Sequence, residues 1–408
     1  MVNAGDTAFV LLSAALVFIM VPGVSFFYGG LGSKKNLVNN MMSSIIIMGL
    51  GVVMWVLFGY SLTFGESVCG FIGKLDFNTL SNSFTSAASP YAQSIPSAAF
   101  VVFQMMFALL APALIVGAVE GRMRFRPLFF FLAIWSIIVY YPIAHMNWAK
   151  DGMLGVNHLG SVDFAGGNVV HVSSGITGLI IATLIGKRKD FGCVSHHNVP
   201  FVLIGTTLLW FGWFGFNSGS ALSAGPIAAH AFLTTVTSAA SAFLTWILID
   251  VLRKRRAKLT SGCIGAVVGL VSITSGAGYV PVWAAVIIGA FASVFSYVSS
   301  RLIKRKFGID DALDVFACHG VGGIWGGIAT GIFADTAISS VVKPGLIFGQ
   351  FDQFLAQIGG IFVTMIVALS GTLISAYVAG IFSRLRASDQ EEIDGMDITQ
   401  HEEEPYCA

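Results

Sequence analysis

The sequence predicts an all-α membrane protein that crosses the bilayer many times. Three observations lead to this class: 55% of the 408 residues are hydrophobic, only 11% are charged, and the mean hydropathy is +0.81. Because a soluble domain carries about 25% charged residues, a soluble enzyme is excluded. The 22 basic and 21 acidic residues leave a net charge of +1, which gives no basis for nucleic-acid binding.

Apolar runs long enough to cross a bilayer, which takes about 20 residues, occur along the whole chain. Eleven such runs, separated by Gly, Pro or charged residues, begin near residues 7, 41, 97, 127, 167, 199, 228, 261, 281, 312 and 352. The first run, residues 8–28, has neither a basic leader nor a small-residue cleavage site. We therefore expect it to be a retained helix and not a signal peptide.

The basic residues predict the orientation, because positively charged loops stay in the cytoplasm. When alternate loops are assigned to opposite sides, 19 of the 22 Lys and Arg residues fall on one side, and only Lys74, Lys150 and Lys343 fall on the other. We therefore expect a multi-pass protein of the cell membrane with its N-terminus outside and its C-terminus in the cytoplasm.

Eleven spans divide into two sets of five and one additional helix. A repeat with an odd number of helices reverses its topology in the second copy, as in transporters built from two inverted halves. The fifth and tenth spans would then be equivalent. Each has an acidic residue near its start and a histidine inside it, Asp163 with His171 and Asp314 with His319.

Two of the eight histidines, His171 and His319, fall well inside predicted spans, whereas His145 and His230 fall near outer helix ends where hydration is expected. Each of the first two lies about eight residues from opposite faces, and therefore about 12 Å deep at about 1.5 Å per residue. They would meet near the middle of the bilayer. A pair that shares one hydrogen bond can pass a proton; two separately satisfied core histidines are the alternative.

Six motifs of this chain resemble the ammonium transporter family, the Amt/MEP/Rh group, and specifically its Amt/MEP branch. They are GVSFFYGGLGSKKN (23–36), FQMMFALLAPALIVGAVEGRMRF (103–125), DFAGGNVVH (163–171), GWFGFNSGS (212–220), DVFACHGVGG (314–323) and GMDITQHEEEPY (395–406). The resemblance implies two inverted five-helix repeats plus one helix, and a homotrimer with one pore per subunit. It divides the chain into a transmembrane domain, residues 1–382, and an acidic cytoplasmic regulatory tail, residues 383–408.

The resemblance also assigns roles to individual residues. It implies a substrate-binding site at Phe107, Trp148 and Ser220, a gate at Phe107 and Phe216, a pore and proton relay at His171 and His319, structural support from Asp163, and further lining by Phe103 and Trp213. Aromatic faces attract a small cation, and a hydroxyl oxygen accepts one of its N–H bonds. The family implies neither a cofactor nor a metal, and a transporter and not an enzyme.

The implied activity is transport in which ammonium loses a proton, ammonia crosses the pore, and the proton moves separately. An ammonium sensor with little transport and an electroneutral ammonia channel are the alternatives. A carrier for larger amines is disfavoured, since no acidic residue lies deep in the membrane between the two vestibules.

The acidic tail resembles a regulatory segment of the family, although a simply solvated tail is the alternative. The resemblance implies docking on cytoplasmic loops, with Arg124 or Arg188 as partners, a PII signalling protein at the cytoplasmic face, and a regulatory phosphosite at Thr399.

Overall fold

The computed structural model describes residues 1–192, 196–253 and 256–406, and these are mostly helical. Lys254 and Arg255, two of the cations used to orient the chain, and the tail residues 407–408 lie outside the described residues. Within the described ranges, ten segments are long and apolar enough to cross a membrane, and one shorter apolar helix, α12 (Leu259–Ile273), adds an eleventh. The predicted eleven-helix class is confirmed.

Several spans consist of two or more consecutive helical elements. The spans are α1 and α2 (Ala4–Phe18, Met20–Leu31), η1, α3, η2 and α4 (Lys34–Asn36, Leu37–Met54, Trp55–Gly59, Tyr60–Phe64), α6 (Ser97–Val119), α7, η3 and α8 (Phe125–Trp135, Ser136–Tyr140, Tyr141–Trp148), η4 and α9 (Gly167–Val172, Ser173–Ile185), α10 (Val199–Gly219), α11 (Pro226–Leu252), α12, α13 and η5 (Val282–Arg301, Leu302–Lys306), η6 and α14 (Phe316–Gly320, Val321–Phe333) and α15 (Asp352–Phe382).

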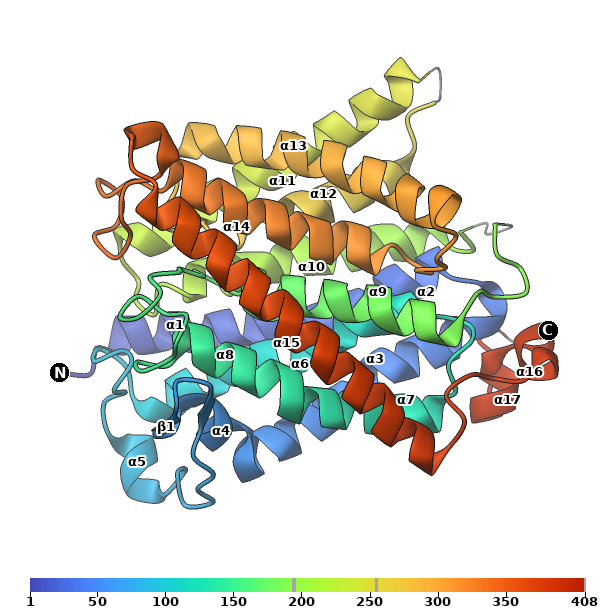
Figure 1. The fold of residues 1–408 in the computed structure, drawn as a ribbon, viewed down its shortest axis with the longest axis horizontal. Helices are drawn as coiled ribbons and strands as arrows, with labels where there is room; N and C mark the ends of the chain where they lie inside the picture. Colours follow the sequence, from blue (N-terminus) through green and yellow to red (C-terminus); the bar gives the residue numbers. More distant parts are fainter. Residues whose placement is uncertain (193–195, 254–255, 407–408) are drawn as a thin grey trace.

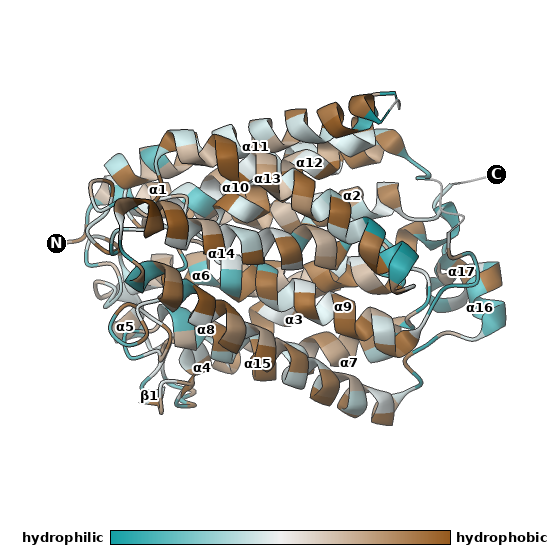
Figure 2. Ribbon diagram, turned by 45° about the horizontal axis from the view of Figure 1, so that its top comes forward, coloured by the Kyte–Doolittle hydropathy of each residue, from teal (hydrophilic) through white to brown (hydrophobic). Residues whose placement is uncertain are grey.

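Short elements occupy the two ends of the bundle. They are the two-stranded antiparallel hairpin β1 and β2 (Ser67–Val68, Ile72–Gly73), the helices α5 (Asn82–Ser86) and η7 (Leu346–Phe348), and the tail helices α16 (Asp389–Asp394) and α17 (Met396–His401). The N-terminus and the hairpin lie at one end, the tail lies at the other, and α15 crosses the face between them (Figure 1). Hydrophilic residues gather at both ends, whereas the helices between them are mainly apolar (Figure 2).

The fifth and tenth spans begin in the same way, although they start at opposite ends of the bundle. Each opens with a π-helical turn, η4 or η6, that carries a histidine. The Asp163 carboxylate accepts four backbone N–H bonds, from residues 166–169, at 2.6–3.0 Å. The Asp311 carboxylate accepts the N–H groups of Val315 and Phe316 at 3.0 and 2.7 Å.

Asp314 lies near the start of the tenth span as expected, but Asp311 and not Asp314 is the counterpart of Asp163, because Asp311 caps the first turn of η6. The Asp314 carboxylate instead accepts hydrogen bonds from the Ser300 hydroxyl at 2.6 Å and from Lys304 Nζ at 2.8 Å. Asp163–His171 and Asp311–His319 share one spacing in the sequence. Both carboxylates satisfy N–H groups that the first turn of a helix leaves without an intrahelical partner.

The two histidine-bearing spans cross at glycines. A Cβ atom on Gly175 would lie 2.0 Å from the backbone nitrogen and 2.3 Å from the Cα of Gly320. Small residues at such a crossing let membrane helices approach closely. Gly175 and Gly320 therefore set the separation of α9 from η6. His319 lies in η6, and His171 lies in η4, directly before α9.

A Gly175→Ala variant is expected to be destabilised by about 1–3 kcal/mol, since the added methyl meets backbone atoms that cannot rotate away. The thermal unfolding midpoint in detergent measures this effect. Gly380→Ala is the matched control, because a methyl added at Gly380 would have no atom within 4 Å. Equal midpoints in the two variants would contradict the proposed role of the crossing.

Candidate functional site

An aromatic cluster lies at the hairpin end of the bundle, where α6, α8 and α10 converge. The ring of Phe107 on α6 contacts Trp148 at the end of α8, with centroids 5.7 Å apart and an interplanar angle of 84°. The indole N–H of Trp148 donates to the carbonyl of Asp163 at 2.9 Å. Asp163 thus caps η4 with its carboxylate and holds Trp148 with its carbonyl.

The hydroxyl group predicted for this site belongs to Ser220, which directly follows α10. Its Oγ donates to the Phe216 carbonyl at 2.8 Å. Because this bond uses the only hydroxyl proton, the oxygen can act only as an acceptor toward any further partner. Ser220 and Trp148 are partly exposed, whereas Phe107 and Phe216 are buried.

Below the cluster, Phe107 and Phe216 form a tight stack with centroids 4.4 Å apart and an interplanar angle of 31°. Phe103, one helical turn before Phe107, packs against it at 5.0 Å. All three rings have exposed fractions of 1% or less. They form a buried apolar constriction between the aromatic cluster and the interior.

The two predicted histidines meet beyond this constriction. The Nδ1 atoms of His171 and His319 are 3.3 Å apart, and the rings are nearly parallel, with centroids 5.3 Å apart. One ring must donate through Nδ1–H while the other accepts. His171 Nε2 is buried without a partner among the described residues. A buried polar nitrogen without a hydrogen-bond partner costs free energy, so this atom is available to bind a molecule that enters the space beside it.

Trp213 on α10 forms a wall beside His171. Its ring stacks on the imidazole with centroids 5.3 Å apart and also contacts Phe216 at 5.4 Å. The indole N–H donates to Thr274 Oγ1 at 2.9 Å, and the threonine hydroxyl donates in turn to the Leu270 carbonyl at 2.8 Å. Thr274 therefore determines the orientation of Trp213 against His171.

A Thr274→Val variant is expected to lower the free energy of unfolding by about 1–3 kcal/mol, because the buried indole N–H of Trp213 loses its acceptor. Thr274→Ser keeps the hydroxyl and is expected to retain most of the stability. The thermal unfolding midpoint in detergent measures the difference. A serine variant as impaired as the valine variant would contradict the hydrogen-bond explanation.

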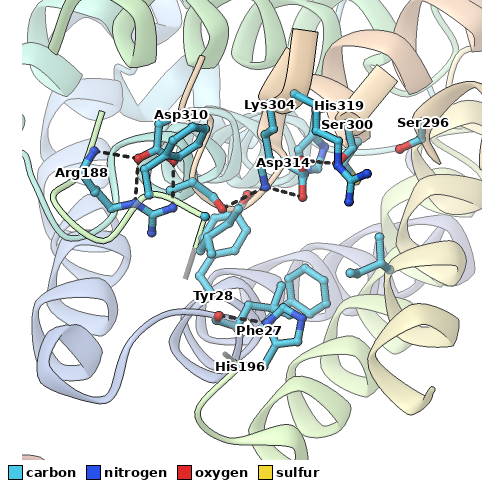
Figure 3. A pocket seen from close by; sticks show the side chains of 18 of the residues that line it. Phe27, Tyr28, Arg188, His196, Ser296, Ser300, Lys304, Asp310, Asp314 and His319 are labelled. Atoms are coloured by element: carbon cyan, nitrogen blue, oxygen red, sulfur yellow. Dashed lines mark hydrogen bonds and ion pairs between the residues drawn. The ribbon is translucent and has the colours of Figure 1, made fainter. Parts of the chain in front are cut away.

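A cavity of about 420 Å³ opens on the tail side of the histidine pair. His319 lines it together with α2, α13, and the loops before α10 and η6. Figure 3 shows His319, Lys304, Asp314 and Ser300 on one wall and Tyr28, Phe27 and His196 on another. Among the described residues, no group of three or more His, Cys, Asp or Glu side chains is placed to hold a metal ion.

A buried group of charges, which sequence patterns did not indicate, lies beside this cavity. Arg188 donates to Glu120 Oε2 at 2.7 Å and to both carboxylate oxygens of Asp310 at 2.8 Å. Arg122, fully buried, donates to the carbonyls of Ala118 and Asp310. Burial opposes ionisation of Asp310, but its bonds to Arg188 hold the pKa of this carboxyl below its usual value.

The tail docks on this end of the bundle and is not simply solvated. Arg124 pairs with Glu391 at 2.7 Å, which confirms one of the two predicted partners. Arg188 was the other, and that prediction is wrong, because its guanidinium is already taken up by Glu120 and Asp310. Met396 N donates to Asn36 Oδ1 at 3.0 Å, and Asn39 N donates to Asp397 Oδ1 at 2.8 Å.

Two further histidines are bonded within the protein. His145, expected to be hydrated, is fully buried; its Nδ1 is 2.8 Å from the Thr63 carbonyl and its Nε2 is 2.8 Å from Ser67 Oγ. The hairpin of β1 and β2 supplies Ser67 and covers the helix end, which a hydropathy pattern cannot reveal. His230 Nε2 lies 2.9 Å from the Val280 carbonyl.

The structure therefore brings together the aromatic residues and the histidines that the sequence assigned to a pore. Phe107 contacts both Trp148 and Phe216, and His171, His319 and Trp213 lie directly beyond them; Ser220 follows Phe216 at the end of α10. Sequence reasoning missed Asp311 and Thr274. The spacing of eight residues before His319 was the only signal that pointed to Asp311.

Within the described residues, eleven apolar helical spans around a buried histidine pair define a multi-pass helical membrane protein. The model of the Ammonium Transporter Family matches residues 8–406. The chain belongs to this family.

Similar proteins agree with this assignment. The ammonium transporter of Bacillus subtilis is 42% identical over 98% of both chains, and Ammonium transporter Amt1 of Archaeoglobus fulgidus is 40% identical over 98% of this chain and 99% of its own. The crystal structure of Saccharomyces cerevisiae Mep2 superposes with a TM-score of 0.86 at 36% identity, covering 95% of this chain and 88% of its own.

Proposed function

We propose that this protein moves ammonium across the cell membrane by separating it into ammonia and a proton. The observation that carries the proposal is the contact between His171 and His319, which lies between a dry aromatic constriction and an inner cavity. Membership of the Ammonium Transporter Family supports the substrate.

Recruitment takes place at the outer cluster. The faces of Phe107 and Trp148 attract the cation, a contribution of about 0.5–2 kcal/mol, and the Ser220 oxygen accepts one of its N–H bonds. Asp163 supports this site without touching the ion, because its carboxylate is taken up by four backbone N–H groups. Its carbonyl holds the indole of Trp148.

Deprotonation follows from the cost of desolvation. A charge placed in a span costs several kcal/mol, and the gate formed by Phe107 and Phe216 offers no polar atom to replace water. Ammonia therefore passes the gate, with Phe103 and Trp213 lining the path. The proton moves separately through the His171–His319 hydrogen bond, because each ring has one donor and one acceptor nitrogen.

The same proposal includes the division of the chain, its orientation and its assembly. Residues 1–382 are the transmembrane domain and residues 383–408 are a regulatory tail. The N-terminus is outside, and the tail lies in the cytoplasm, since it docks on Arg124 and Lys189 in loops rich in Lys and Arg. The subunits assemble as a homotrimer with one pore each, and a PII signalling protein binds the cytoplasmic face.

Current on a solid-supported membrane tests the transport step, with purified protein in liposomes that receive an ammonium pulse. A transient current with ammonium and none with potassium is expected, because potassium has no proton to release. Uptake of ammonia without current would instead favour an electroneutral channel. Binding of ammonium with neither current nor uptake would favour a sensor.

Phosphorylation of Thr399 would regulate the tail. The side chain is partly exposed in α17, and its hydroxyl donates to the Gly395 carbonyl at 2.9 Å. Added negative charge would lie near the buried Asp397 carboxylate, which anchors α17 at the start of α3.

A Thr399→Asp variant is therefore expected to loosen the tail and change the transport rate several-fold. Limited proteolysis of the tail and the ammonium-evoked current are the two measurements, and Thr399→Ser is the control. A tail that stays protected, with an unchanged current, would rule out this regulation.

A further inference from the structure

Two buried glutamines on α15, Gln353 and Gln357, have no role in the transport steps described above. They lie one turn apart near the start of α15, which begins at the hairpin end of the bundle (Figure 1). Their exposed fractions are 1% and 0%. Because a buried amide is costly without hydrogen bonds, its partners show which segment it holds. Both amides bond to the clamped loop, residues 160–162.

Gln357 bonds to both polar groups of one backbone residue. The N–H of Val162 donates to Gln357 Oε1 at 2.7 Å, and Gln357 Nε2 donates to the Val162 carbonyl at 2.9 Å. A side-chain amide carries the same donor and acceptor as a peptide group, so Gln357 pairs with Val162 as a neighbouring strand would. Among the described residues, the backbone of Val162 forms no other hydrogen bond. The position of Val162 therefore depends on α15.

Further contacts hold the rest of the clamped loop against α15. Ser161 Oγ donates to Gln357 Oε1 at 3.0 Å, and Gln353 Nε2 donates to the Gly160 carbonyl at 3.0 Å. A Cβ atom on Gly360 would lie 2.4 Å from Ser161 Oγ, so the missing side chain lets the loop lie directly on the helix. Three consecutive residues of the loop are thus bonded to two side chains of α15.

The clamped loop leads directly into the aromatic cluster. The residue that follows Val162 is Asp163, whose carbonyl accepts the indole N–H of Trp148 at 2.9 Å. The carbonyls of Val162 and Asp163 belong to adjacent peptide groups, so a shift of Val162 moves the atom that orients Trp148. Two hydrogen-bonded steps therefore connect Gln357 with the ring of Trp148, although the two side chains lie on different helices.

The chain after Asp163 has its own hydrogen bonds, which do not involve α15. The N–H of Phe164 donates to the Ser275 carbonyl at 3.0 Å, and the N–H of Ala165 donates to the Thr274 carbonyl at 3.2 Å. These bonds hold the start of η4, which carries His171. Loss of the Gln357 bonds should therefore disturb Trp148 more than the histidine pair.

We propose that Gln357, assisted by Gln353, is a positioning residue for cation recruitment. It fixes Val162 so that the Asp163 carbonyl keeps the Trp148 ring in place for ammonium. The inference rests on the proposed function, in which Trp148 recruits the ion, and it adds a determinant of affinity that lies outside the pore. Gln357 itself touches neither the ion nor the gate. Its loss should therefore weaken ammonium binding and leave the later steps of transport unchanged.

A Gln357→Met variant of the full-length protein tests this role, because methionine nearly conserves the volume and removes both bonds to Val162. The ammonium-evoked current in liposomes is measured over a range of ammonium concentrations. The half-saturating concentration is expected to rise about five- to twentyfold, while the maximum current changes less than about twofold. A lower maximum current at an unchanged half-saturating concentration would overturn the proposal.

Thr372→Val is the matched control on the same helix. Thr372 is also fully buried, and its hydroxyl donates to Thr177 Oγ1 on α9 at 2.9 Å, far along α15 from the clamped loop. This variant is expected to lower the unfolding midpoint, as Gln357→Met does, but to keep the half-saturating concentration of the wild type. An equal rise in both variants would assign the effect to general destabilisation and overturn the positioning role.

A double-variant cycle shows whether Gln357 acts through Trp148. In a Trp148→Leu background, Gln357→Met is expected to raise the half-saturating concentration less than about twofold further, because the positioned ring is already absent. Effects that simply multiply would contradict the proposal. Gln353→Met, which removes the bond to Gly160 only from the clamped loop, is the milder variant if Gln357→Met does not fold, with an expected rise of about two- to fivefold.

The wild-type current separates failure of this inference from failure of the proposed function. A wild type that carries ammonium current, together with unchanged half-saturating concentrations in both glutamine variants, would overturn the positioning role alone. A wild type that neither binds nor carries ammonium would overturn the proposed function, and the positioning role with it.

Discussion

Replacing both His171 and His319 by alanine is expected to reduce the ammonium-evoked current at least about tenfold, or to abolish its preference for ammonium over potassium. The two rings are the only ionisable groups that meet between the constriction and the inner cavity within the described structure, and their nitrogens are 3.3 Å apart. Removing them eliminates the proton path and leaves space that water can fill. Positioned proton-transfer groups typically contribute factors of about 10²–10⁴ to a rate.

The control for this experiment is His158→Ala, a matched substitution of an exposed histidine in the loop between α8 and η4. Its current is expected to equal that of the wild type. Ammonium binding at the outer cluster, measured separately, should persist in the double variant, because Phe107, Trp148 and Ser220 remain. A double variant with normal current and normal selectivity would show that the histidines are not the proton path, even if transport itself were established.

The second large effect is expected for Arg188→Gln, which should destabilise the protein by about 3–5 kcal/mol. The substitution leaves the Glu120 carboxylate without an ion pair among the described residues and Asp310 with Arg122 alone, and breaking a buried ion pair carries a penalty of this size. The thermal unfolding midpoint in detergent is the measurement. Lys189→Gln is the adjacent control, since Lys189 pairs with the exposed Asp389 and such pairs contribute at most about 1 kcal/mol.

The same network determines a pH dependence. Because Arg188 holds the pKa of Asp310 below the value of an unfolded aspartate, near 3.8, the stabilisation is fully present above that pH. It is lost as the pH falls further, when the carboxyl is protonated. Arg188→Gln should therefore show a weaker dependence of its unfolding midpoint on pH as the pH falls below about 4. An identical dependence in both proteins would contradict the assignment.

Much of the fold was predictable because hydropathy and helix length are local properties. Every predicted start of a span lies within four residues of a helix start, and the family motifs identified His171, His319 and the outer aromatic residues. Those predictions needed only the period of apolar residues and the cost of burying a charge in lipid.

Contacts between segments far apart in the sequence determined which polar side chains pair with one another. In the sequence, Asp314 was the acidic residue chosen as the counterpart of Asp163, but in the structure Asp311 accepts the first N–H groups of η6. Likewise, the sequence offered Arg188 as an ion-pair partner for the acidic tail. In the structure its guanidinium instead bonds to Glu120 and Asp310, which are far apart in the chain.

The amino-acid sequence by itself determined the membrane class, the number of spans and the chemical types of the residues along the pore. Only the tertiary structure decided which polar groups satisfy one another: Thr274 with Trp213, Asp163 with Trp148 and η4, and Arg188 with two acids. The physical reason is that hydropathy acts through the environment of each residue alone, whereas a hydrogen bond or ion pair requires two groups to meet within about 3 Å. That meeting depends on how the helices cross, and at Gly175 and Gly320 the crossing is as close as two backbones allow.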